Sequence, residues 1–305
     1  MRINDSQGLP LPSFYDDQRL ADIWDIPYHA RSSDAKQWAT DYDILPSLSD
    51  RYKIGLLLID VQNTFCIPDF DLFVSGASGM AAVEDNQRLC SFIYRYLNVI
   101  TDIHAMLNTH LSFKVFHPSF FKEEYLDSSR CKEKGSEYSS ENYDDSSSFI
   151  DVHQEGIGLI KWPFSRLLGG EGHSLVSGVA EALFFHSMVR HNSVFFNLGG
   201  ASSSLSGGFC LKSMDWVQRL MSYDKLIVAG QSKSHSVNWT ISHLLAALNE
   251  YDKSLARKIY LLDDCMSPVV LGNGINFSTV TEENFNIFKE SGVNIVSSLI
   301  PMREW

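Results

Sequence analysis

Long apolar runs, paired cysteines and clusters of basic residues are scarce in this sequence of 305 residues. Its longest apolar stretches, such as 54–59, are far shorter than the roughly 20 residues that a membrane-spanning helix needs, so no membrane span is predicted. The net charge of −12 disfavours binding to nucleic acid or to anionic lipid, because both require a basic surface. These absences favour a globular protein whose partners are small molecules or other proteins.

Cysteine usage and the amino-terminal residues indicate the compartment. Five cysteines make an odd number without the short-spaced pairs of a metal site, and we interpret them as free thiols in a reducing environment. The opening residues, Met-Arg-Ile-Asn-Asp-Ser, have neither the apolar run of a signal peptide nor the acid-poor composition of a transit peptide. A cytoplasmic location is therefore expected.

Composition divides the chain into an arm and a larger domain. Residues 1–50 are rich in proline, aspartate and aromatic residues without sustained periodicity, which predicts an ordered arm with one short helix near 34–41. Residues 51–305 carry the strand and helix patterns of the main domain. Within them, 122–148 is rich in Ser, Glu, Asp and Lys and nearly free of aliphatic residues, which is typical of a polar insertion.

Strand and helix patterns alternate through residues 51–305. Residues 53–60 form a continuous apolar run that ends in a carboxylate, as expected for a strand buried on both faces of a parallel sheet. Helical periodicity follows at 81–102, and the alternation continues through strands predicted at 104–107, 193–197, 226–229, 258–262 and 293–296 and helices predicted at 173–190, 211–221, 234–249 and 282–289. This alternation predicts an α/β fold with a doubly wound, mostly parallel sheet and helices on both faces.

Residues 225–240 have the pattern of a strand that delivers a side chain to the start of a helix. The strand ends at Gly230, and Ser236 stands where the helix begins. A helix amino terminus favours an anion, which suits a thiolate better than a hydroxyl. Because functional groups of open α/β sheets gather at the carboxyl ends of strands, we expect Asp60, the segment after Asn197 and Ser236 to converge.

Two of these segments resemble known motifs. The residues Leu-Leu-Ile-Asp60-Val-Gln-Asn-Thr-Phe-Cys are similar to the first motif of the isochorismatase-like cysteine hydrolases, the superfamily of nicotinamidases and isochorismatases. The residues Val-Ala-Gly-Gln-Ser-Lys-Ser-His-Ser236-Val resemble its nucleophile motif, and the resemblance covers roughly residues 50–300. It implies the isochorismatase-like hydrolase fold and a homo-oligomer.

The resemblance also implies three catalytic positions. In that superfamily an Asp acts as general base, a Lys stabilises negative charge, and a Cys attacks the carbonyl carbon to form an acyl-enzyme. On this chain the Asp corresponds to Asp60, whereas the Lys position is Leu198 and the Cys position is Ser236. Two of the three groups are therefore replaced by residues that do not supply the same chemistry.

The metal site of nicotinamidases is replaced in the same way. Its Asp-x-His pair corresponds to Asn108-Thr-His110, and its third His, in a Trp-Pro-x-His motif, corresponds to Ser165. An alternative register places Val115-Phe-His117 at the first motif, which also lacks the carboxylate. Either set is poor for a divalent cation, so neither a metal nor another cofactor is expected.

Other residues of these motifs are candidates for the lining of a ligand pocket: Phe65, His110, His117, Trp162 and His235. Lys161 could reach across a cleft and replace the missing ammonium, because its side chain is long and flexible.

Simpler interpretations remain open for the same residues. Asp60 could cap a turn, Ser236 could cap the helix, and Lys233 is expected to be exposed or at the rim of the site. His235 and Ser236 are sequence neighbours, and neighbours at a helix start point in different directions.

Three functions are consistent with these observations. The leading hypothesis is a pseudoenzyme that keeps the fold and acts by binding a small molecule or by assembly, because losing members of a catalytic unit removes several orders of magnitude in rate. The alternative is an amide or ester hydrolase with Ser236 as nucleophile and Asp60 as base. The third is a structural subunit that contacts a protein partner through the arm 1–50 and the insertion 122–148.

Overall fold

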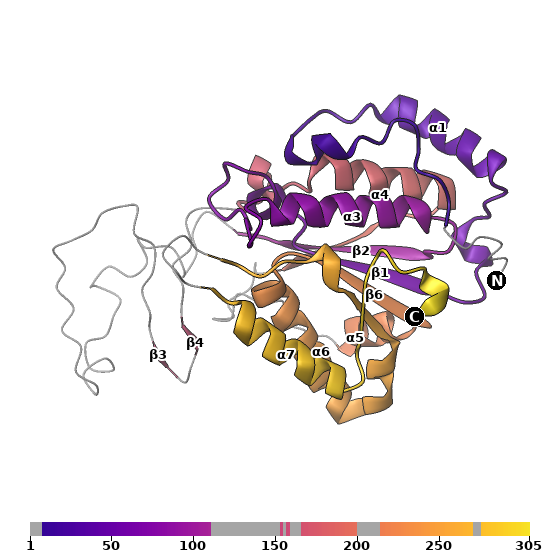
Figure 1. The fold of residues 1–305 in the computed structure, drawn as a ribbon. Helices are drawn as coiled ribbons and strands as arrows, with labels where there is room; N and C mark the ends of the chain where they lie inside the picture. The colour runs from indigo at the N-terminus through magenta and orange to yellow at the C-terminus, as the bar shows by residue number, and fades with distance from the viewer. Residues whose placement is uncertain (1–7, 111–152, 155–156, 159–165, 200–213, 271–275) are drawn as a thin grey trace.

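A six-stranded parallel sheet forms the centre of the protein (Figure 1). The computed structural model describes residues 8–110, 153–154, 157–158, 166–199, 214–270 and 276–305. The strand order is β5-β2-β1-β6-β7-β8, with bounds β1 (Ile54–Ile59), β2 (Asp102–Asn108), β5 (Phe195–Gly199), β6 (Lys225–Gly230), β7 (Ile259–Leu262) and β8 (Asn294–Val296). A separate antiparallel pair joins β3 (His153–Gln154) to β4 (Ile157–Gly158). The predicted doubly wound α/β fold is confirmed.

Burial along the strands explains why they form. All six residues of β1 are buried, because β1 lies between β2 and β6 and both faces of the sheet are covered there. Such a strand must be apolar throughout, and its sequence Ile-Gly-Leu-Leu-Leu-Ile is. The edge strand β5 instead alternates between half-buried and exposed side chains before it ends in a buried glycine.

Helices cover both faces of the sheet (Figure 1). On one side lie α3 (Ala81–Arg95) and α4 (Ser177–Arg190), with α1 (Tyr28–Asp41) outside them; on the other lie α5 (Met214–Met221), α6 (Asn238–Tyr251) and α7 (Ser278–Glu290). The helix predicted over 81–102 ends at Arg95, because the chain then turns and buries Leu97 and Ile100 before β2 begins. No helix among the described residues is long and apolar enough to cross a membrane.

The amino-terminal arm folds onto α3 and α4. It contains a helical turn, η1 (Asp17–Ala21), the helix α1, which is longer than expected, and a second turn, η2 (Ser47–Ser49). Leu20 is buried so closely against α4 that a Cβ added to Gly178 would lie 2.6 Å from its Cδ1 atom. Arg31 of α1 forms an ion pair of 2.7 Å with the buried carboxylate of Glu181. The insertion predicted at 122–148 lies outside the described residues.

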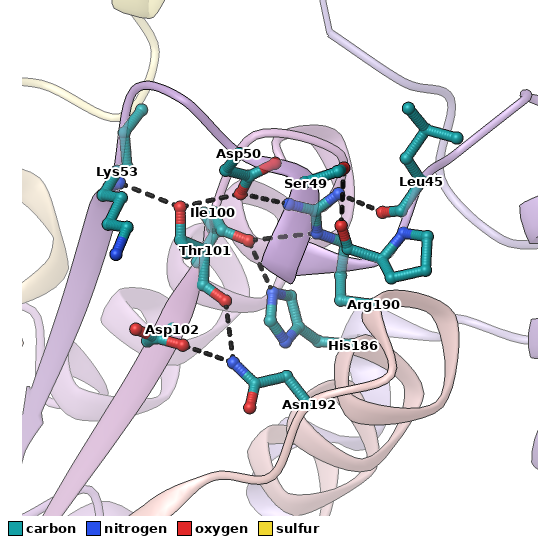
Figure 2. Close-up of polar contacts among 12 residues, drawn as sticks. Leu45, Ser49, Asp50, Lys53, Ile100, Thr101, Asp102, His186, Arg190 and Asn192 are labelled. Carbon is teal, nitrogen blue, oxygen red and sulfur yellow. Dashed lines mark hydrogen bonds and ion pairs between the residues drawn. The ribbon is translucent and has the colours of Figure 1, made fainter.

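A buried arginine links the arm to the amino-terminal edge of the sheet (Figure 2). The Arg190 side chain at the end of α4 is 1% exposed and donates hydrogen bonds to the carbonyl oxygens of Ile100 and Leu45. It also forms an ion pair with Asp50, which in turn accepts a hydrogen bond of 2.8 Å from the Thr101 hydroxyl. The arm and the start of β2 are therefore held by one charged group.

The carboxyl ends of β1 and β6 approach each other more closely than any side chain allows. Gly230 ends β6 with φ of +129°, and a Cβ built on it would lie 2.0 Å from the carbonyl oxygen of Ile59. The same oxygen accepts a hydrogen bond of 2.8 Å from the Gln231 N–H. Glycine is required here both for its backbone conformation and for the space it leaves.

Replacing Gly230 should therefore strongly destabilise the folded state. We expect Gly230→Ala to lower the free energy of unfolding by about 4 kcal/mol or more, because the methyl group collides with backbone rather than with a movable side chain. Gly79→Ala is the matched control, since Gly79 also has a positive φ (+83°) but no atom within 4 Å of the added Cβ. It should lose only about 1–2 kcal/mol. Urea unfolding of both variants tests this, and equal losses would contradict the steric argument.

Candidate functional site

Asp60 is the buried carboxylate at the carboxyl end of β1. It has a left-handed backbone conformation, with φ of +52°, and its N–H donates a 2.9 Å hydrogen bond to the Met106 carbonyl of β2. Burial raises the pKa of the Asp60 carboxyl to about 6, because water no longer solvates its charge. An acid with this pKa changes protonation state close to neutral pH.

Polar groups from three other segments lower the pKa of Asp60 and so partly oppose the effect of burial. In order of size, they are the Ser236 hydroxyl, which forms a hydrogen bond with the carboxylate, the positive charge of Arg166, and the Asn108 amide. The Asn108 Nδ2 atom lies 3.4 Å from the Asp60 Oδ2 atom. The structure thus brings together Asp60, Asn108 and Ser236 from the predicted set, and adds Arg166 to them.

Arg166 was not among the predicted site residues. Its side chain is buried, and its guanidinium lies over the Phe65 ring at 5.2 Å and donates a 2.8 Å hydrogen bond to His110 Nε2. Burial lowers the pKa of Arg166 to about 10, while the nearby Asp60 raises it, so the group stays charged at neutral pH. The one sequence signal was that Arg166 is the only Lys or Arg in the stretch from Trp162 to His173.

Leu198, the position at which the resemblance implies a lysine, supplies no charge to Asp60. It lies near the end of the edge strand β5, paired with Leu107, and its side chain is 51% exposed. The positive charge beside Asp60 therefore comes from Arg166 and not from β5. The remaining candidates in these loops, His117, Lys161, Trp162 and Ser165, lie outside the described residues.

Ser236 lies in η5 (Lys233–Val237), a π-helical turn between β6 and α6. The Ser236 side chain is half-buried, whereas its neighbour His235 is buried between aromatic rings, 4.9 Å from Phe277 and 5.5 Å from Trp239 by ring centroids. The His235 Nδ1 atom lies 2.8 Å from the Ser234 hydroxyl. Burial lowers the pKa of His235 to about 4, so its imidazole is neutral at physiological pH.

Lys233 differs from the expectation that it is exposed or at the rim of the site. Its side chain is only 5% exposed and forms ion pairs with Asp263 at 2.9 Å and Glu282 at 2.8 Å. Burial lowers its pKa, but the hydrogen bonds to these two carboxylates outweigh burial, and the pKa is raised. Lys233 therefore fixes the turn η5 to α7 and to the end of β7, which a surface lysine would not do.

Gln62 fixes the backbone around the site. Its Nε2 atom donates to the carbonyl oxygens of Asn108, at 3.1 Å, and His173, at 2.8 Å. Its Oε1 atom accepts a 2.8 Å hydrogen bond from the Asn108 N–H. One buried amide thus links the segment after Asp60 to the end of β2 and to the loop before α4.

The described residues at the predicted metal positions do not fit a divalent cation. An arginine only donates hydrogen bonds, so His110 Nε2 must accept from Arg166, and its lone pair is then occupied. The Asn108 amide nitrogen faces Asp60, and the charge of Arg166 would repel a metal ion. Among the described residues, no group of three or more His, Cys, Asp or Glu side chains is arranged to hold a metal.

No cysteine in the described part of the chain is placed to supply the thiolate that the resemblance would require at position 236. Cys66, Cys90 and Cys265 are buried free thiols. Burial raises the pKa of Cys66 to about 12 and raises the pKa of Cys90 and Cys265 as well. A thiol with a raised pKa is a poor nucleophile at neutral pH.

The burial of Asp60 predicts a pH dependence of stability. The folded state holds the Asp60 proton up to about pH 6, whereas an aspartate carboxyl in the unfolded chain loses it near pH 3.8, so stability falls as pH rises between these values and the loss persists above them. The difference corresponds to about 3 kcal/mol. We expect Asp60→Asn to gain this amount relative to wild type between pH 4 and pH 7, measured by urea unfolding. A constant difference across this range would contradict the raised pKa.

Comparisons with known proteins agree with the fold. No protein-family model and no curated protein matches the sequence. Among solved structures, the chain is similar to yeast nicotinamidase bound to the inhibitor nicotinaldehyde, with a TM-score of 0.52 and 15% identity over 80% of this chain and 99% of that one. It is also similar to a nicotinamidase/pyrazinamidase of Acinetobacter baumannii, with a TM-score of 0.50 and 14% identity over 82% and 98%. The chain therefore has the isochorismatase-like hydrolase fold that these nicotinamidases share.

Proposed function

We propose that the chain binds a small planar carboxylate or amide at the Asp60 site and does not turn it over by acyl transfer. The observation that carries the proposal is the buried carboxylate of Asp60, which accepts a hydrogen bond from the Ser236 hydroxyl and whose pKa is lowered by the positive charge of the buried Arg166. Buried charges are costly unless they are paired. A site that keeps two of them has the polarity to orient a ligand, even where the nucleophile of the fold is absent.

The chemistry of Ser236 argues against efficient acyl transfer. An ordinary thiol has a pKa of about 8.5, so proton transfer from it to a carboxylate with a pKa of about 6 costs about 3 kcal/mol. A serine hydroxyl is a far weaker acid than a thiol, and the same carboxylate is too weak a base to activate it well. Neutral His235, held by Ser234 and the rings around it, supplies no additional charge to the reaction.

Arg166 favours an anionic ligand. A guanidinium recognises a carboxylate through charge-assisted hydrogen bonds, which are about twice as strong as neutral ones. The position of Arg166 over the Phe65 ring and against His110 orients the group. The ligand that matches this arrangement is a planar carboxylate, with Asp60 holding a proton between the two anions. Nicotinate and nicotinamide are suitable probes, because the similar yeast structure is a nicotinamidase.

A second function is favoured by one observation. The Asp60 carboxylate forms a hydrogen bond with Ser236 and titrates near neutral pH, as a general base does. A hydrolase would then use Ser236 as nucleophile, Asp60 as base and Arg166 to stabilise the developing negative charge, acting on an amide or an ester.

The hypothesis of an assembly subunit has less support. It assigned the arm 1–50 as a contact surface, but Phe14, Leu20 and Arg31 of the arm pack against α3 and α4 of the same chain. A homo-oligomer and a cytoplasmic location stay predictions.

Ligand titration tests the binding proposal. We expect nicotinate to bind about tenfold more tightly than nicotinamide, a difference of about 1.4 kcal/mol, because only nicotinate carries a charge for Arg166. Arg166→Gln should remove this preference. Arg303→Gln is the matched control, since it removes the same charge from an exposed site near the carboxyl terminus. Isothermal titration calorimetry measures the affinity of the wild type and of both variants for each compound. If the wild type bound neither compound, the proposal would be contradicted.

Restoring the thiol tests the absence of acyl transfer. Wild type should release no more nicotinate from nicotinamide than Ser236→Ala does, whereas Ser236→Cys should raise the rate at least about tenfold, because a thiol is a stronger acid and nucleophile than a hydroxyl. Chromatographic detection of nicotinate measures the reaction. Wild-type turnover that Asp60→Ala abolishes would favour the hydrolase and contradict the proposed function.

A further inference from the structure

Asp85 is a buried carboxylate on α3 that belongs to none of the motifs. Its side chain is 2% exposed, and burial raises its pKa. The Oδ1 atom accepts a 2.8 Å hydrogen bond from Arg88 Nη2, and the Oδ2 atom accepts one of 2.7 Å from Gln231 Nε2. Burying a charge costs free energy, and a helix that packs on a sheet does not need one. The hydrogen-bond partners of Asp85 therefore indicate which groups it holds in place.

The partner of Asp85 is the first residue of the segment that leads to Ser236. Gln231 is fully buried, and its N–H donates to the Ile59 carbonyl, one residue before Asp60. Its Oε1 atom lies 3.5 Å from the Ser267 N–H, while the Ser267 carbonyl accepts a 2.9 Å hydrogen bond from the Lys233 N–H. The Gln231 side chain therefore connects α3 to Ser267, and the Ser267 backbone in turn holds the Lys233 N–H.

The turn is fixed at its other positions as well. The Ser234 hydroxyl accepts a 3.0 Å hydrogen bond from the Val269 N–H, and Lys233 is held by Asp263 and Glu282. These contacts come from the segment after β7 and from α7 on one face of the sheet. Asp85 supplies the contact from the opposite face, and without it the Gln231 amide has no charged acceptor to fix its orientation.

We infer that Asp85 is a positioning residue that holds the Ser236 hydroxyl against Asp60 by orienting the Gln231 amide. The significance of this inference rests on the proposed function, which depends on the contact between Ser236 and Asp60. The contact itself exists in the free protein and can be tested without any ligand.

Asparagine at position 85 cannot make the same contacts. A carboxylate accepts hydrogen bonds at both oxygens, which is what Gln231 and Arg88 require, whereas the asparagine amide accepts at one atom and donates at the other. The Ser267 side chain also forms a hydrogen bond with this carboxylate. In Asp85→Asn either the Gln231 or the Arg88 contact places two donors against each other. The Gln231 side chain would then turn, and the turn after it would shift away from Asp60.

The pKa of Asp60 reports this shift, because the Ser236 hydrogen bond lowers that pKa. It can be measured by carbon NMR of protein labelled in the aspartate carboxyl groups, with the resonance assigned by its loss in Asp60→Asn. We expect Asp85→Asn to raise the pKa of Asp60 by about 0.5–1 pH unit, as Ser236→Ala does. The double variant should show no further rise, because both changes remove the same hydrogen bond.

Removing a nearby negative charge without moving the turn would change the pKa of Asp60 in the opposite direction. Neutralising a nearby carboxylate stabilises the ionised form of Asp60 and lowers its pKa. Glu84→Gln is the matched control, since Glu84 precedes Asp85 on α3 and is more exposed; it should leave the pKa of Asp60 unchanged or slightly lower. If Asp85→Asn does not fold, Gln231→Met removes the amide while keeping the length of the side chain, and the same rise is expected.

An unchanged or lowered pKa of Asp60 in the folded variants would overturn the inference. So would a further rise in the double variant, because the two residues would then act separately. Neither result depends on nicotinate or nicotinamide, so failure of the proposed function and failure of this inference are distinguishable.

Discussion

No side chain fits between the carboxyl ends of β1 and β6. The hydrogen of Gly230 points at the Ile59 carbonyl, and the Gln231 N–H then bonds to the same oxygen. This close contact fixes where the chain leaves β6 relative to Asp60, which follows Ile59 directly. The position of Ser236 against the Asp60 carboxylate therefore depends on two adjacent strands meeting without a side chain between them.

Burial of Asp60 sets the second requirement. A carboxylate removed from water must be compensated, and here the compensation comes from a hydroxyl, an amide and a guanidinium that belong to different segments. The guanidinium is the notable member, because the sequence places no cation on β5, where Leu198 is half-exposed. The positive charge of the site is thus supplied by a loop residue, while Leu198 on the neighbouring strand is apolar.

The sequence predicted the features that depend on local patterns. The apolar run 53–60 predicted β1 because a central parallel strand is buried on both faces, and the alternation of elements predicted the sheet and the placement of Asp60 at its carboxyl edge. Arg166 could not be found in this way, because its position relative to Asp60 depends on the path of a loop. The burial of Lys233 and Asp85 could not be predicted for a related reason, because a charged residue usually indicates a surface position. Only the tertiary contacts of Lys233 with Glu282 and of Asp85 with Gln231 explain it.

The Arg190 network, drawn in Figure 2, lies at the start of β2, whereas Asp60 follows the end of the parallel strand β1, at the opposite end of the sheet. It joins the arm, α4 and the beginning of β2 without using any atom of the site. The identity of the residues at 198 and 236 therefore does not affect this network. A chain arranged in this way can change the side chains around Asp60 and still reach the same folded state, so its chemistry can change independently of its foldability.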